Sequence, residues 1–221
     1  MLKQSLILFA AAISIPFGAA QPVSHIAVPA ELLSAAQQEP LSFAMSLADA
    51  SVPNGLEITA PAQLPKSKPH FDLKKQSTVD LGQVVDAFNL RHTNHHAAID
   101  DGVVVLRPTG RRVRYLDSQA ALEPVVVTGL MRAVRKIFNP NLSDTEPLAG
   151  STLGLTPDEA GEFTTVTLDG HGRSVIAVLN QLAKQSGRGW LVVTSDENGS
   201  PRVRAFGLIH RHGSITRVDV D

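Results

Sequence analysis

The feature that most constrains the fold of this chain is a pattern of a strand, a helix and a hairpin that occurs twice. In the first copy, one helical face is formed by residues spaced i, i+3, i+4 and i+7, which are Leu81, Val84, Val85 and Phe88. In the second copy, the corresponding face consists of Val175, Ile176, Val178, Leu179, Leu182 and Ala183. Each helix is followed by two apolar segments separated by turn-forming residues, which predicts a hairpin.

The two copies also share a register. When the second copy is shifted onto the first, Leu73 aligns with Leu168, and Leu81 aligns with Ile176. We therefore predict a duplicated unit with a β-α-β-β core. The expected fold class is α+β, with two small related units, each a small mixed or antiparallel sheet with helices packed on one face.

Local signals set the expected boundaries. The first unit spans residues 40–108 and the second spans residues 163–221. A basic linker, a helix and a polar loop fill residues 109–162, and the helix is expected from Val127 to Phe138 because its apolar residues follow helical spacing. Residues 21–39 are expected to be partly tethered or mobile.

Individual turns and caps can be predicted as well. Asp101-Gly102 is a favoured hairpin turn between two β-prone segments. Phe71 and Leu73 point to one face of an expected strand, and Ser77 or Thr78 is expected to cap the helix that follows it.

Two segments of the chain resemble the short N-terminal domain shared by secretins and TonB-dependent transporters. They are "FDLKKQSTVDLGQVVDAFN…AIDDGVVVLRP" and "VTLDGHGRSVIAVLNQLAKQSGRGWLVV". In that family a strand leads through a Gly/Ser turn into a Leu-x-x-Leu helix, which is followed by Gly and an apolar strand. The second segment matches through Leu179, Leu182 and Gly187, whereas the first has Arg91-His92 in place of the glycine. The resemblance implies a periplasmic domain that docks partners or packs beside copies of itself, without catalytic residues.

The N-terminus has the pattern of a secretory signal peptide over residues 1–20. Lys3 precedes the apolar run "LILFAAAISIPFG", and small residues stand before Gln21. This run is shorter than the ~20 apolar residues of a membrane-spanning helix, and an uncleaved anchor is the alternative interpretation. The chain contains no Cys, which excludes disulfides and lipoprotein acylation. We expect a periplasmic or secreted protein with no membrane span after cleavage of the signal.

Composition excludes several classes of function. A net charge of −1 gives no electrostatic basis for binding nucleic acid. Aromatic residues make up 5% of the chain, which disfavours a stacking surface for bases or sugars. The chain also lacks the Gly-x-Ser-x-Gly elbow and the glycine-rich phosphate and dinucleotide motifs.

Three histidines, His92, His95 and His96, lie close together and are followed by acidic residues. If the first helix continued to His96, these imidazoles would share one face and bind a metal such as zinc. We favour a polar turn instead, because Asn94 and the following β-prone run indicate that the helix ends near His92. His210 and His212 are expected to be exposed.

A group of arginines follows the first hairpin: Arg107, Arg111, Arg112 and Arg114. Such a group either meets an anionic partner or is a solvated linker. The sequence therefore predicts a non-enzymatic exported protein-interaction module without a cofactor. Its partner would be an unidentified envelope protein, bound through a sheet edge or the arginine-rich segment, or a second copy of the chain. The alternative is a small histidine-dependent metal-binding protein or metalloenzyme.

Overall fold

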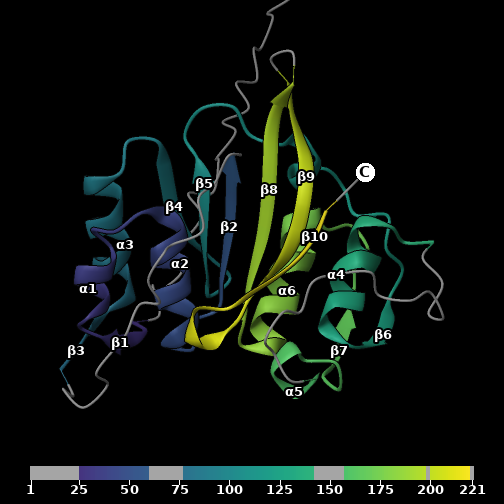
Figure 1. The fold of residues 1–221 in the computed structure, drawn as a ribbon, viewed down its shortest axis with the longest axis horizontal. Helices are drawn as coiled ribbons and strands as arrows, with labels where there is room; N and C mark the ends of the chain where they lie inside the picture. The colour runs from purple at the N-terminus through teal and green to yellow at the C-terminus, as the bar shows by residue number, and fades with distance from the viewer. Residues whose placement is uncertain (1–24, 60–76, 142–156, 198–199, 220–221) are drawn as a thin grey trace, which may run out of the picture.

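The computed structural model describes residues 25–59, 77–141, 157–197 and 200–219. Its main feature is a six-stranded sheet with the order β10-β9-β8-β2-β5-β4 (Figure 1). The strands are β2 (Asn54–Thr59), β4 (His95–Asp100), β5 (Val103–Pro108), β8 (Gly189–Glu197), β9 (Ser200–Ile209) and β10 (Ile215–Asp219). Strand β2 is parallel to both of its neighbours, β5 and β8, whereas the remaining pairs are antiparallel.

Helices surround this sheet. They are α1 (Leu32–Ala35), α2 (Pro40–Asp49), α3 (Leu81–Arg91), α4 (Leu130–Phe138), α5 (Pro157–Ala160) and α6 (Val175–Ser186), with 3-10 turns η1 (Arg114–Asp117) and η2 (Arg211–Gly213). Two short antiparallel strand pairs complete the described fold. They are β1 (Ala27–Pro29) with β3 (Thr78–Asp80), and β6 (Val125–Thr128) with β7 (Thr165–Leu168). In Figure 1, α1, α2 and α3 lie toward one side of the molecule and α4 and α6 toward the other.

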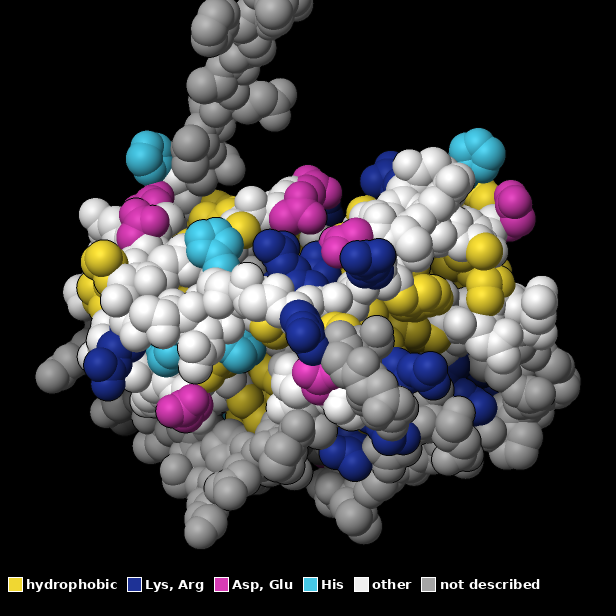
Figure 2. Space-filling view, turned by 90° about the horizontal axis from the view of Figure 1, so that it is seen from above, with side chains coloured by type: hydrophobic (Ala, Val, Ile, Leu, Met, Phe, Trp, Pro, Cys, Tyr) yellow, Lys and Arg dark blue, Asp and Glu magenta, His cyan; other side chains and the backbone are white. Residues whose placement is uncertain are grey.

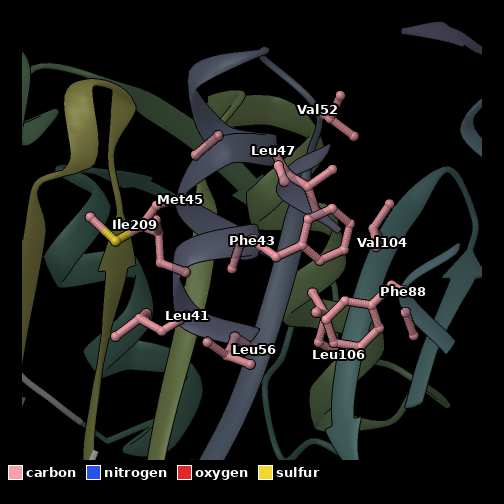
Figure 3. Packing of buried hydrophobic residues seen from close by; sticks show 14 of the residues in the cluster. Leu41, Phe43, Met45, Leu47, Val52, Leu56, Phe88, Val104, Leu106 and Ile209 are labelled. Atoms are coloured by element: carbon pink, nitrogen blue, oxygen red, sulfur yellow. The ribbon is translucent and has the colours of Figure 1, made fainter. Parts of the chain in front are cut away.

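One hydrophobic core lies between the sheet and helices α1, α2 and α3. Phe43 from α2 stacks on Phe88 from α3, with ring centroids 4.9 Å apart, above Leu56 of β2 and Leu106 of β5 (Figure 3). Strands β8 and β9 contribute Leu191, Val193, Ala205 and Ile209 to the same cluster. This core is therefore shared between the two halves of the chain.

A second core covers the opposite face of the sheet. Trp190 of β8 is buried there among residues of α4 and α6, and its indole N–H donates to Asn180 Oδ1 at 3.0 Å. Gly55 lies directly beneath this ring, because a Cβ at that position would be 1.8 Å from the Trp190 side chain. Glycine at position 55 thus allows the indole to pack flat on β2.

Several predicted turns and ends are confirmed. Asp101 and Gly102 both adopt positive φ, 49° and 77°, and connect β4 to β5. Gly187 ends α6 in the left-handed conformation, as expected for a helix C-terminus. The cap of α3 differs from the prediction, because Asp80 accepts from the Gly82 N–H at 2.8 Å, whereas Thr78 belongs to β3.

One element prediction is wrong. The helix expected from Val127 begins only at Leu130, because residues 125–128 form β6 and Gly129 turns the chain with a φ of 97°. The segment 21–39, expected to be partly tethered or mobile, contains β1 and α1, and Val28 and Leu32 are buried in the first core. The strand expected at Phe71 and the signal segment 1–20 lie outside the described residues.

The α+β class and the mixed sheet are confirmed. The strands of both predicted units join in one continuous sheet through the pairing of β2 with β8. The duplication stays a prediction. The N-terminal and C-terminal halves of the chain share one structural feature. Each half contains a short antiparallel pair, β1/β3 or β6/β7, whose second strand leads to a long helix, α3 or α6.

Candidate functional site: an arginine pocket and an open sheet edge

His92 is part of the structure of the α3 C-terminus. Its ring stacks on Phe88 with centroids 4.2 Å apart, and its Nε2 lies 3.2 Å from the carbonyl oxygen of Ala36. The helix ends at this residue, as the polar-turn interpretation expects. His92 therefore joins α3 to the end of α1.

His95 and His96 are neighbours on β4, where successive side chains point to opposite faces. His95 is half-buried, burial lowers its pKa, and its Nε2 has no hydrogen-bond partner among the described residues. His96 is exposed. Across the described ranges, no group of three His, Cys, Asp or Glu side chains could hold a metal ion, so His92, His95 and His96 are not brought together as ligands.

His210 is buried, contrary to the expectation of exposure. Only 2% of it is accessible to solvent, and its Nε2 lies 2.7 Å from Thr216 Oγ1. Arg188 contacts its Nδ1, which assigns the ring proton to Nε2. Burial first, and then the positive charge of Arg188, lower the pKa of His210 to about 4. The burial of His210 could not be predicted from the sequence, because the strand that covers its ring, β10, comes after a turn.

Arg107 is also buried and cannot act as a surface contact for a partner. Its Nε donates to Glu57 Oε2 at 2.7 Å, and its Nη1 and Nη2 contact the carboxylate of Asp117. The other oxygen of Glu57 accepts from the Val113 backbone N–H at 2.7 Å. The acidic residue inside the apolar segment "NGLEIT" is the sequence signal that could have indicated this network.

The remaining predicted arginines line one pocket. It has a volume of about 710 Å³ and is lined by Arg111, Arg112, Val113, Arg114, Tyr115, Pro201, Arg202 and Val203. The pocket lies at the end of the molecule where the parallel strands β5, β2 and β8 terminate. Figure 2 looks down on this end and shows Lys and Arg side chains gathered over its middle and lower right. Sequence reasoning missed Arg202, because it comes from β9, far along the chain.

The walls of the pocket are anchored on both sides. The Glu57–Arg107–Asp117 network holds the backbone at Val113, and Asp117 ends η1. On η1, Tyr115 stacks on Phe138 at 5.7 Å, and Phe138 stacks in turn on buried Phe206 at 4.6 Å. Burial raises the pKa of the Tyr115 hydroxyl. The arginines are thus presented by a segment attached to the core.

The two edges of the six-stranded sheet differ. On β4, the outward-facing N–H and C=O of Ala97 are both bound by the Asn89 side chain of α3, at 2.7 Å and 2.9 Å. On β10, the His210–Ser214 hydrogen bond sets the register, so that the backbone groups of Ile215 and Arg217 face outward. No strand in the described part of the chain pairs with this outer side. An amide thus occupies the β4 edge at Ala97, whereas the β10 edge has no strand partner within the described ranges.

Comparisons with known proteins found no family model, curated protein or solved structure that matches the chain. None of the helices in the described ranges has the length and hydropathy required for a bilayer span.

Proposed function

We propose that this chain is an exported, non-enzymatic protein-interaction module of the bacterial envelope, and that it binds its partner by adding a strand to β10. The observation that carries the proposal is the difference between the two sheet edges. An open edge presents unpaired N–H and C=O groups that an extended segment of another protein can bind. The signal-peptide pattern and the lack of Cys support an envelope location.

The chemistry of the edge defines the partner segment. Arg217 lies in the middle of β10, and its side chain is exposed. A segment that pairs with β10 therefore benefits from acidic residues on the side facing Arg217. The partner is proposed to be an envelope protein with an extended, acidic segment.

Site-specific photo-crosslinking tests the proposal. A photoreactive amino acid replaces Arg217 on the open edge, and a matched variant carries it at Ala98 on the closed edge β4. In the envelope of the source bacterium, we expect one discrete adduct from position 217 and none from position 98. Mass spectrometry should identify the adduct as an exported protein. Adducts of equal yield from both positions, or none from position 217, would overturn the proposal.

A backbone variant separates strand pairing from charge. Proline at position 217 removes an outward-facing N–H without breaking the β9–β10 ladder, since proline is tolerated on the outer side of an edge strand. We expect Arg217→Pro to abolish co-purification of the partner that crosslinking identifies, and Arg217→Ala to reduce it only slightly. Retention of co-purification by the proline variant would contradict strand addition.

A further inference from the structure

We infer that the arginine pocket is a binding site for a ligand that carries a multiply charged phosphate group. The site goes beyond the proposed docking at β10, because it uses other side chains and does not require strand addition. It is formed by Arg111, Arg112 and Arg114 from the connection after β5 together with Arg202 from β9. Its charge, its apolar walls and its attachment to the core each support the assignment.

Two of the four pocket arginines have no acidic partner within the described part of the chain. Arg111 pairs with Asp196 at 3.4 Å, and both side chains are more than half exposed. Arg112 and Arg114 make no ion pair with any residue in the described ranges. A single carboxylate would offset one guanidinium charge, whereas a phosphate monoester or diphosphate carries two or more charges and can accept bidentate hydrogen bonds from several guanidinium groups.

The pocket also has an apolar side. Val113 is buried, Pro201 and Val203 are half-buried, and Tyr115 beside them is 39% exposed. A free inorganic anion would leave this surface unused. The arrangement fits a ligand in which a phosphate is joined to an apolar or ring-containing group, such as a lipid headgroup region or a small organic phosphate.

The attachment to the core favours binding over simple solvation of the arginines. Val113 is held by Glu57, and Tyr115 is held by Phe138, so the backbone that carries Arg112 and Arg114 is fixed before a ligand arrives. Preorganised donors lose less conformational entropy on binding than donors on a free linker. This distinguishes the pocket from the solvated-linker interpretation of the same arginines.

Calorimetric titration of the full chain with inorganic pyrophosphate tests the inference. The double variant Arg112→Ala/Arg114→Ala removes two pocket charges, and the matched control Arg91→Ala/Arg173→Ala removes two exposed charges elsewhere. We expect the pocket variant to bind about tenfold or more weakly, as the loss of charge-assisted hydrogen bonds implies, and the control to change less than about twofold. Equal thermal unfolding of both variants and the parent shows that the fold is kept.

Vesicle binding identifies the source of the phosphate. Phosphatidylcholine vesicles with and without phosphatidic acid are sedimented with the protein, with and without pyrophosphate. Binding to phosphatidic acid that pyrophosphate displaces supports a lipid headgroup as the ligand, whereas pyrophosphate binding alone supports a soluble phosphate. The inference is overturned if neither probe binds, or if the control variant loses affinity as much as the pocket variant does.

Discussion

The contact of Glu57 with Arg107 places two opposite charges inside the molecule. Glu57 is fully buried, and 8% of Arg107 is exposed. Burying a charge is costly unless it is paired and hydrogen-bonded, and here each oxygen of Glu57 accepts one hydrogen bond. Burial of Glu57 is thus tolerated only while both Arg107 and the Val113 N–H donate to it.

Replacing Glu57 with Gln should therefore destabilise the protein strongly. The amide N–H₂ would face the donors of Arg107 or Val113, and the buried guanidinium would lose its closest counter-charge. We expect a loss of about 3 kcal/mol in the free energy of unfolding, measured by urea denaturation. Asp117→Asn is the control. Because the Asp117 side chain is 55% exposed, this substitution should lower the free energy of unfolding by less than about 1 kcal/mol. Similar losses for both variants would contradict this account.

His210 should make the stability depend on pH. Its pKa is about 4 in the folded protein, against about 6.5 for an unperturbed histidine. As the pH falls from about 6.5 to 4, the unfolded chain therefore binds a proton that the folded protein does not, and the folded state loses stability.

The variant His210→Gln isolates this effect, because glutamine can accept from Arg188 and donate to Thr216 without titrating. Between about pH 7 and pH 4.5, we expect the parent to lose about 2–3 kcal/mol more than the variant in urea unfolding. The same change at exposed His171 controls for the loss of one imidazole. Parallel pH profiles for the parent and His210→Gln would contradict the assignment.

At the residue scale, sequence reasoning recovered local features and missed long-range ones. The Asp101-Gly102 turn and the Gly187 helix end follow from backbone preferences of the residues themselves. The pairing of Arg107 with Glu57, 50 residues away, depends on two strands lying side by side. The pattern of charges along the chain does not indicate which strands are neighbours. From the sequence, Arg107 therefore cannot be distinguished from the exposed arginines that follow it.

Amide side chains from helices close strand edges at two places in the fold. Asn89 of α3 binds both backbone groups of Ala97 on β4. On β7, Gln185 of α6 binds the N–H and C=O of Thr167. Gln181 makes the same two bonds to Asp169 beside it. Each amide occupies the backbone groups that another strand would use.

Opening the β4 edge should change both stability and association. Asn89→Ala leaves the N–H and C=O of Ala97 without their protein partner, and we expect a loss of about 1–2 kcal/mol in unfolding free energy. Sedimentation analysis should also show concentration-dependent self-association through the opened edge. Gln83→Ala, at an exposed position on the same helix, is the control. A monomeric Asn89→Ala variant of parent stability would contradict the proposed role.

Elements with strong periodicity were predictable from the sequence. The apolar stripes of α3 and α6 and the two hairpins follow the expected spacing. The boundary of α4 was not predictable in this way, because Val127 continues the helical spacing of the following residues. Its β-branched neighbours pair instead with residues 165–168, a contact that only the tertiary fold supplies.

At the scale of the whole molecule, the two halves cannot be separated without exposing core. The first core includes Leu191 and Ile209 from the second half, and the second core includes Val103 and Val105 from the first. The two predicted units therefore share both hydrophobic cores.

A fragment of residues 25–108 should accordingly fail to fold alone. It would expose the face of β2 that contacts Trp190 and the edge that pairs with β8. We expect the fragment to give a weak near-ultraviolet circular dichroism signal and no cooperative unfolding transition. Adding a fragment of residues 109–221 should restore the signal and the cooperative transition. Cooperative unfolding of residues 25–108 alone would instead support two independent domains.

The central position of β2 also has a consequence for the order of events during synthesis. Thr59 at the end of β2 contacts Thr194 of β8, which is 135 residues further along the chain. A ribosome adds about 5–20 residues per second, so β8, the second neighbour of β2, is synthesised several seconds or more after β2. Contacts of such long range also slow folding. During this interval the side of β2 that later pairs with β8 has no strand partner. A chain that stays unfolded until its synthesis is complete avoids exposing this side of β2 in a partly formed sheet.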